Sequence, residues 1–241
     1  MKKCGLISIS LFFILLASCS PIKNMNTDVL EPAEISFPDD IYSLAFLMPN
    51  PEVIINTRTY DEIDARPGKE LWAGIVDIAA ISPRFNVNAF KFLDNYTDTI
   101  PEATLGWEEV RKITDSLDVD ALVAFHQIKF SDSLTRDIVY DFDYQSFYFI
   151  YEVYSTISWK IYDPTSQSIF NENNYKEKFV WESLGYDERE AINGLVSINE
   201  AFLSAAYWSG NDIGHILFPY WVEQERFYFI RGNKYFRRAR N

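Results

Sequence analysis

Apolar residues alternate with polar ones between residues 147 and 161, and this is the clearest pattern along the chain. Successive side chains of a β-strand point to opposite faces, so the spacing predicts a long strand over residues 146–162 with one buried face. A helix would not align these positions. The positions on the predicted buried face are Phe147, Phe149, Tyr151, Val153, Ile157, Trp159 and Ile161.

Two elements are predicted upstream from shorter patterns. An apolar run at residues 41–48, closed by Pro49-Asn50-Pro51, predicts a buried first strand. Helical spacing follows at residues 67–81, where Pro67 suits the first helical position and Ser82-Pro83 ends the pattern. The predicted buried face of this helix contains Leu71, Ile75, Ile78 and Ala79.

The middle of the chain continues the alternation of strands and helices. Partial alternation at residues 84–92 predicts a second strand, and residues 121–130 predict a third. Between them, residues 104–117 predict a second helix. Its expected inward side chains are Trp107, Val110, Ile113 and Leu117. Residues 131–145 are polar and aromatic, and we expect a loop there.

The chain then returns as a strand and ends in helices. Residues 163–167 predict a turn, and residues 168–170 and 175–182 predict strand. Asp187, with Glu190 three residues later, matches a capping box that opens a third helix. Its expected buried stripe is Ile192, Leu195, Val196, Phe202, Leu203 and Ala206; Gly210 and Gly214 interrupt it before a short helix, and residues 224–230 are extended.

The elements occur in the order β-α-β-α-β-β-β-α. This order predicts an α/β (α+β) fold, a mixed β-sheet with helices mainly on one face.

The amino terminus has the features of a bacterial signal peptide. Two lysines precede an apolar run of about 12 residues, too short to span a bilayer as a helix. The run ends in Leu16-Ala17-Ser18-Cys19, which matches a lipobox. We therefore expect cleavage between Ser18 and Cys19 and acylation of Cys19, with palmitate as a suitable label. The alternatives are an ordinary secreted protein with an incidental cysteine, or an uncleaved anchor.

This interpretation divides the chain into four parts: a signal peptide at 1–18, a lipidated tether at 19–38, a single globular domain at 39–230, and a basic tail at 231–241. Because Cys4 lies in the signal peptide, the mature chain keeps one cysteine, which is acylated. It can then form no intramolecular disulfide or thiolate metal site, so stability depends on a hydrophobic core.

Charge restricts the partners of the main domain. The net charge is −13, and loss of Lys2 and Lys3 makes it −15. A body this acidic repels nucleic acid and anionic lipid surfaces, so we expect no nucleic-acid partner. The basic tail is either a solvated helix end or a segment that touches phosphate, lipid headgroups or an acidic partner.

Little candidate chemistry is visible. Asp137, Asp141 and Asp143 cluster with aromatic residues in the expected loop. They suit either a weak cation or sugar site or a solvated loop, and the solvated loop is the simpler interpretation. His126 and His215 have no metal-ligand spacing and are expected to be packed or surface residues. We therefore expect no catalytic residue, metal or cofactor.

The helix–strand junction Leu117-Asp118-Val119-Asp120-Ala121-Leu122-Val123 resembles the "Gly-x-Asp-Ala" junction of curli-secretion lipoproteins and of TolB-type amino-terminal domains, which share the predicted order of elements. A second resemblance is to an uncharacterised lipoprotein family of Bacteroides-type bacteria. It is carried by Pro32-Ala33-Glu34-Ile35, Arg84-Phe85, Trp159-Lys160-Ile161-Tyr162-Asp163-Pro164, Pro219-Tyr220-Trp221 and Arg226 with Tyr228. Neither resemblance implies a catalytic residue.

These observations favour a membrane-anchored envelope lipoprotein that acts as a non-enzymatic binding or assembly module with an envelope protein partner. One alternative is a subunit of a secretion or assembly complex similar to curli-secretion lipoproteins. Another is a glycan-acting enzyme that uses paired carboxylates. The neutral Ser20 after Cys19 favours the outer membrane, facing the periplasm.

Overall fold

A computed structural model describes residues 22–48, 54–56, 67–85, 90–93, 104–141 and 144–229. The chain forms two compact units, residues 31–220 and a smaller unit that contains residues 1–30 and 221–241. The larger unit is a mixed α+β fold, as the order of elements predicts. The predicted boundaries of signal peptide, tether, domain and tail stay predictions.

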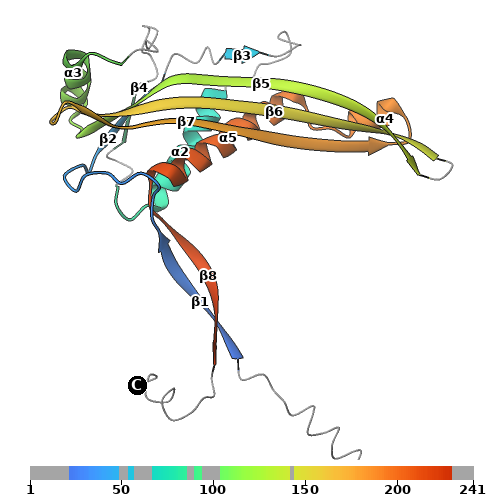
Figure 1. Cartoon of the computed structure of the whole chain (residues 1–241), viewed down its shortest axis with the longest axis horizontal. Helices are drawn as coiled ribbons and strands as arrows, with labels where there is room; N and C mark the ends of the chain where they lie inside the picture. Colours follow the sequence, from blue (N-terminus) through green and yellow to red (C-terminus); the bar gives the residue numbers. More distant parts are fainter. Residues whose placement is uncertain are drawn as a thin grey trace, which may run out of the picture. The chain divides into compact units, whose positions relative to one another are not determined.

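A six-stranded sheet organises the larger unit, with strands in the order β4-β2-β5-β6-β7 and β3 beside β5 (Figure 1). Strands β2, β3 and β4 run parallel to their neighbours, whereas β5, β6 and β7 form an antiparallel meander. The strand bounds are β2 Leu44–Leu47, β3 Ile54–Asn56, β4 Phe90–Leu93, β5 Ala121–Asp141, β6 Tyr144–Asp163 and β7 Ser168–Gly185.

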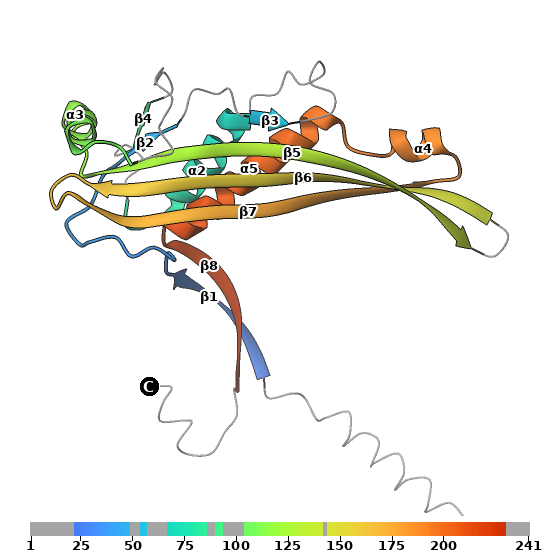
Figure 2. The ribbon, with the colours of Figure 1, turned by 45° about the horizontal axis from the view of Figure 1, so that its top comes forward.

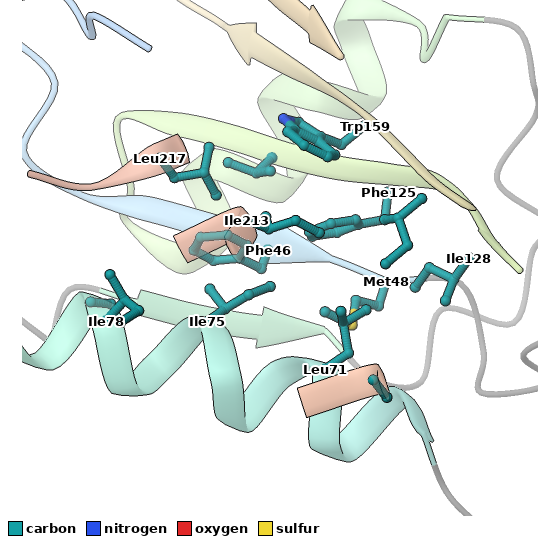
Figure 3. Packing of buried hydrophobic residues seen from close by; sticks show 14 of the residues in the cluster. Phe46, Met48, Leu71, Ile75, Ile78, Phe125, Ile128, Trp159, Ile213 and Leu217 are labelled. Carbon is teal, nitrogen blue, oxygen red and sulfur yellow. The ribbon is translucent and has the colours of Figure 1, made fainter. Parts of the chain in front are cut away.

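The alternation in β6 is confirmed. Six of the seven predicted positions are buried, among them Val153, Ile157 and Trp159, each with no exposed surface. Phe147, nearest the end of the strand, is partly exposed. The buried face of β6 lies on the side of the sheet covered by α2 (Pro67–Ile81) and α5 (Ile198–Leu217), and this side holds the larger core cluster (Figures 1 and 3).

The loop expected at residues 131–145 is wrong, because β5 continues to Asp141 and pairs with β6 along its length. Most side chains from Leu134 to Tyr140 are exposed, so no alternation of burial marks this part of the strand. Its structure comes from hydrogen bonds to β6. Pairing with β6 likewise makes β7 one continuous strand, whereas the sequence predicts two separate segments.

The interruption expected at Gly210 and Gly214 is also wrong, because α5 runs through both glycines to Leu217. The two residues allow α5 to lie close against α2. A Cβ atom on Gly210 would overlap the backbone of Leu71, and one on Gly214 would lie 2.7 Å from Cβ of Ile78. Gly74 has the same role on α2, where a Cβ atom would overlap the backbone of Tyr207. Glycine here permits close backbone contact within an intact helix.

Helix α3 (Trp107–Leu117) covers the opposite side of the sheet. Val110 and Ile113 are buried, as predicted. They pack in a smaller cluster with side chains from β2, β5 and β6, namely Ala45, Leu47, Leu122, Ala124 and Tyr162. The sheet therefore has α2 and α5 on one side and α3 on the other.

The third predicted helix is two helices. Asp187 caps α4 (Glu188–Asn193) by accepting a hydrogen bond from the Glu190 N–H, which confirms the predicted cap. That helix ends at Gly194, and α5 begins anew with Ser197 accepting from the Glu200 N–H. Serine is a strong N-cap residue, so Ser197 marks the start of a second helix within the apolar pattern from which one helix is predicted.

Of the strand predicted at residues 84–92, the structure shows β4 from Phe90 onward, and residues 86–89 lie outside the described ranges. Arg84 and Phe85 have another structural role. The Arg84 guanidinium donates to the carbonyl oxygens of Phe37 and Pro38, at 3.0 and 2.7 Å. The Phe85 ring packs edge-on against Phe37 and Phe218. Arg84-Phe85 thus fixes the segment that leads into β2.

Asp120 ties the end of α3 to the start of β2. Asp118 ends the helix in the left-handed conformation, with φ at 54°. The Asp120 carboxylate then accepts hydrogen bonds from the backbone N–H groups of Tyr42 and Ser43 and from the Ser43 hydroxyl. These contacts set the parallel register of β2 and β5, which explains an aspartate at this junction.

The smaller unit contains a two-stranded ribbon of β1 (Ile22–Glu31) and β8 (Tyr220–Phe229). Asn24 donates to Glu225, and Asn26 donates to Glu223 at 2.7 Å, so the two strands run antiparallel. The segment predicted as a tether therefore includes a strand. No helix in the described ranges is long and apolar enough to cross a membrane.

Candidate functional site

A cavity of about 600 Å³ lies between the inner face of the β5–β6 hairpin and the connection from α4 to α5. It has a polar floor and mostly apolar walls. The lining residues are Asp132, Leu134, Tyr151, Ile192, Asn193, Leu195, Val196, Ser197, Ile198 and Asn199. Figure 2 shows the long hairpin extending past α5 to α4, the two helices that this connection joins.

Strand register places Asp132 and Tyr151 together on the floor. Asp132 is opposite Val153, and Leu134 is opposite Tyr151, so all four side chains are on the helix-covered face. The Tyr151 hydroxyl donates to Asp132 Oδ2 at 3.1 Å. The second oxygen, Oδ1, is buried and accepts no hydrogen bond from the described residues.

The roof of the cavity depends on how closely the α4–α5 connection approaches the sheet. Gly194, which ends α4, faces Ser183 of β7, and a Cβ atom there would overlap the Ser183 hydroxyl. Leu195, Val196 and Ile198 then pack against the core. Leu134 and Ile192 at the rim are each 46% exposed, so the cavity opens to solvent beside apolar side chains.

Electrostatic effects keep the proton of this hydrogen bond on the Tyr151 hydroxyl. Burial, together with the charge and hydrogen bond of Asp132, raises the pKa of Tyr151 well above its ordinary value. Tyr151 is therefore a hydrogen-bond donor, and the carboxylate is an acceptor with one oxygen to spare. A buried acceptor without a donor is costly, so the site favours a ligand that supplies N–H groups or positive charge.

The aspartates predicted as a cation or ligand loop do not form this site. Asp137 is exposed on β5, with Oδ1 accepting from the backbone N–H of Ile138, and Asp141 belongs to the end of the same strand. Asp143 lies outside the described residues, as do Ser18 and Cys19 of the predicted lipidation site. Across the described ranges, no three His, Cys, Asp or Glu side chains are grouped to hold a metal.

The two histidines are packed residues, in agreement with the sequence analysis. His126 Nε2 lies 3.2 Å from the Tyr162 hydroxyl, and the His215 ring stacks on Tyr220 with centroids 4.1 Å apart. Burial lowers the pKa of His215, although Asp212 partly offsets this effect. Both histidines are absent from the lining of the Asp132 cavity.

Sequence reasoning missed Asp132 because it assigned residues 131–145 to a loop. Had the strand been extended past Phe130, the parity of Ile128 and Phe130 would have placed Asp132 on the buried face. A carboxylate at a buried strand position is the signal that could have identified the site.

The chain belongs to the family described as "Domain of unknown function (DUF8603)", whose model matches residues 83–229. The matched segment includes both strands of the cavity floor and the α4–α5 roof. No curated protein matches at a significant level. The resemblances to curli-secretion lipoproteins and to the Bacteroides-type family stay predictions.

Several solved bacterial structures match the chain at low sequence identity and with low TM-scores. A neuraminyllactose-binding hemagglutinin homologue from Helicobacter pylori is 13% identical, with 74% of this chain and 90% of that chain covered and a TM-score of 0.35. The PelC dodecamer from Paraburkholderia phytofirmans is 8% identical, with 79% and 98% covered and a TM-score of 0.29. A minor lipoprotein from Acinetobacter baumannii is 9% identical, with 76% and 98% covered and a TM-score of 0.26. Likenesses this distant assign no ligand to this chain.

Proposed function

We propose that this protein is a lipid-anchored binding module of the bacterial envelope, and that its cavity holds the cationic end of an amphipathic ligand or partner segment. The buried Oδ1 of Asp132, which no described residue hydrogen-bonds, carries the proposal. The protein binds this ligand without transforming it. A segment with an ammonium or guanidinium group at the end of an apolar stem has the required chemistry, and lysine and arginine side chains have this form.

The shape and charge of the cavity support this ligand class. Leu195, Val196 and Ile198 would cover the apolar stem, while the cation would reach the floor and bond Asp132. An anionic ligand would face the Asp132 carboxylate at short range, with repulsion strengthened by the partly buried setting. A neutral apolar ligand would fill the walls but leave Oδ1 without a donor.

The proposed attachment to the membrane is inferred from the amino-acid sequence. The segment Leu16-Ala17-Ser18-Cys19 and the basic, then apolar, residues before it support acylation at Cys19. Two or more acyl chains give stable membrane attachment, whereas one is marginal. We place the protein in the outer membrane, facing the periplasm, because Ser20 is neutral. An envelope protein would then be the natural source of the cationic segment.

The test is thermal unfolding of the full chain in a zwitterionic detergent with three probes of equal chain length: hexylammonium, hexanol and hexanoate. A ligand at a hundred times its Kd stabilises by about 2.7 kcal/mol, which corresponds to a rise in Tm of roughly 5–10 °C for a chain of this size. We expect the rise with hexylammonium, a smaller one with hexanol and none with hexanoate.

Two matched variants locate the effect. Asp132→Asn removes the charge in the cavity, and Asp137→Asn removes the same charge from an exposed position on the same strand. Hexylammonium should stabilise the Asp137→Asn variant as it does the parent and should lose most of its effect on Asp132→Asn. Equal stabilisation of both variants, or equal shifts from hexylammonium and hexanoate, would refute the cavity as a cation site.

A further inference from the structure

Strand β7 is the outermost of the three long strands and leaves one edge of the sheet open (Figures 1 and 2). It pairs with β6 on one side over most of its 18 residues. No described strand pairs with its other side. A row of backbone N–H and C=O groups along that edge is therefore available to another strand.

This edge is long and contains no proline, although it carries charged side chains, among them Lys176 and Lys178. Natural edge strands are blunted by proline, by charged side chains such as lysine, by short length or by bulges that twist the edge away. Strand β7 contains no proline, and its pairing with β6 has one irregularity, opposite Ile161 and Tyr162 near the start of β7. The stretch from Asn173 to Gly185 is regular. It is long enough for strand addition by main-chain hydrogen bonds.

We propose that β7 pairs antiparallel with β7 of a second copy of this chain, about a two-fold axis at Val180, and so joins the two sheets. In this register Val180 meets Val180 of the other copy, and each Lys178 meets the other copy's Glu182. A two-fold interface requires such self-complementarity, because every contact occurs twice. The partner strand is thus supplied by the chain itself.

The side chains at the centre of this register are exposed and on the same face. Val180 is 43% exposed, and the Lys178 side chain is 49% exposed. Both point away from the helix-covered face, as does Glu182, because they alternate with Phe179 and Trp181, which pack against the core. Lys178 is already 2.8 Å from Glu152 of its own chain, so in the pair it would lie between two carboxylates.

Neighbouring registers are less favourable. An axis at Lys178 places the two lysines directly opposite each other, which is destabilising. An axis at Phe179 pairs each Lys178 with Val180, and an axis at Trp181 pairs each Val180 with Glu182. The axis at Val180 combines an apolar contact with two opposite-charge pairs, each the kind of cross-strand pair that stabilises a sheet.

Cysteine cross-linking tests the register in the full lipidated chain. Directly opposite residues of an antiparallel pair have Cα atoms about 4.5–5.5 Å apart, within the range of a disulfide. We expect Val180→Cys to form a disulfide-linked dimer under mild oxidation, as seen on a non-reducing gel. Lys176→Cys is the matched control: it is exposed on the same face, but its two copies would be about eight residues apart along the strands, roughly 26 Å.

A second experiment measures the mass of the protein in detergent micelles by sedimentation. Parent protein should sediment as a dimer, and Val180→Lys, which opposes two cations at the axis, should sediment as a monomer that keeps the circular dichroism spectrum of the folded parent. Thr135→Lys, an exposed change elsewhere on the same face of the sheet, should remain dimeric. A monomeric parent, a dimeric Val180→Lys, or equal cross-linking of Lys176→Cys and Val180→Cys would each overturn the proposal. None of these outcomes bears on ligand binding by the Asp132 cavity.

Discussion

Replacing Gly210 by Ala should destabilise the protein, although alanine is the better helix former. The built Cβ atom lies 2.0 Å from the carbonyl oxygen of Leu71, whereas Cβ contacts below 3.0 Å essentially never occur. Because the obstacle is backbone, α2 and α5 must separate by about 1 Å. Overpacking of this kind costs about 1–3 kcal/mol or more, against a gain of about 1 kcal/mol from helix propensity. We expect a net loss of about 2 kcal/mol and a fall in Tm of roughly 4–8 °C.

Circular dichroism melts of the full chain in detergent measure this effect, with Gly106→Ala as the control. Gly106 precedes α3, and a Cβ atom there meets nothing within 4 Å, so its replacement should cost about 1 kcal/mol or less. If helix propensity governed Gly210, the variant would melt above the parent. A Gly210→Ala protein with an equal or higher Tm would therefore disprove the close contact between α2 and α5.

Three further variants test the sheet, the cavity and the anchor. Val153→Asp should cost several kcal/mol in urea unfolding because it places a carboxylate at a fully buried position. Glu152→Gln on the opposite face should leave the midpoint of urea unfolding nearly unchanged, and the reverse ranking would mean that the face is inverted. In the unfolded chain the Tyr151 hydroxyl ionises near the ordinary tyrosine pKa of 10.0, whereas in the folded protein it stays protonated, so the free energy of unfolding should fall as pH rises above that value. Tyr151→Phe should reduce this fall, and identical alkaline stability profiles of parent and variant would contradict the raised pKa of Tyr151. Cys19→Ala should abolish incorporation of labelled palmitate, and continued labelling would show that the lipobox assignment is wrong.

The sequence predicted the centre of the sheet well because burial there alternates with strand periodicity. Val153, Ile157 and Trp159 lie between the helices and the sheet, so their apolar character reports their position directly. The same reasoning failed in the outer half of β5. From Leu134 to Tyr140 both faces are largely exposed, and the strand is held by pairing with β6, which leaves little pattern in the side chains.

The candidate site was missed for a related reason. Asp132 is separated from the apolar run of β5 by a single residue, and its significance depends on two partners distant in sequence, Tyr151 and the α4–α5 connection. Asp132 is a candidate binding group because it is partly buried and because its Oδ1 accepts no hydrogen bond from the described residues. Gly210 was misinterpreted likewise, because its role depends on the backbone of Leu71 on another helix.

The β1–β8 ribbon has a mechanical consequence. Its hydrogen bonds pair Asn24 with Glu225 and Asn26 with Glu223, so the same register places Phe227 opposite Ile22, three positions after Cys19. A force applied between Cys19, the predicted acylation site, and the end of β8 would pull both strands from the same end of the ribbon. The ribbon would then open one pair at a time, at low force, while the residues between Glu31 and Tyr220 would carry no load until it had opened.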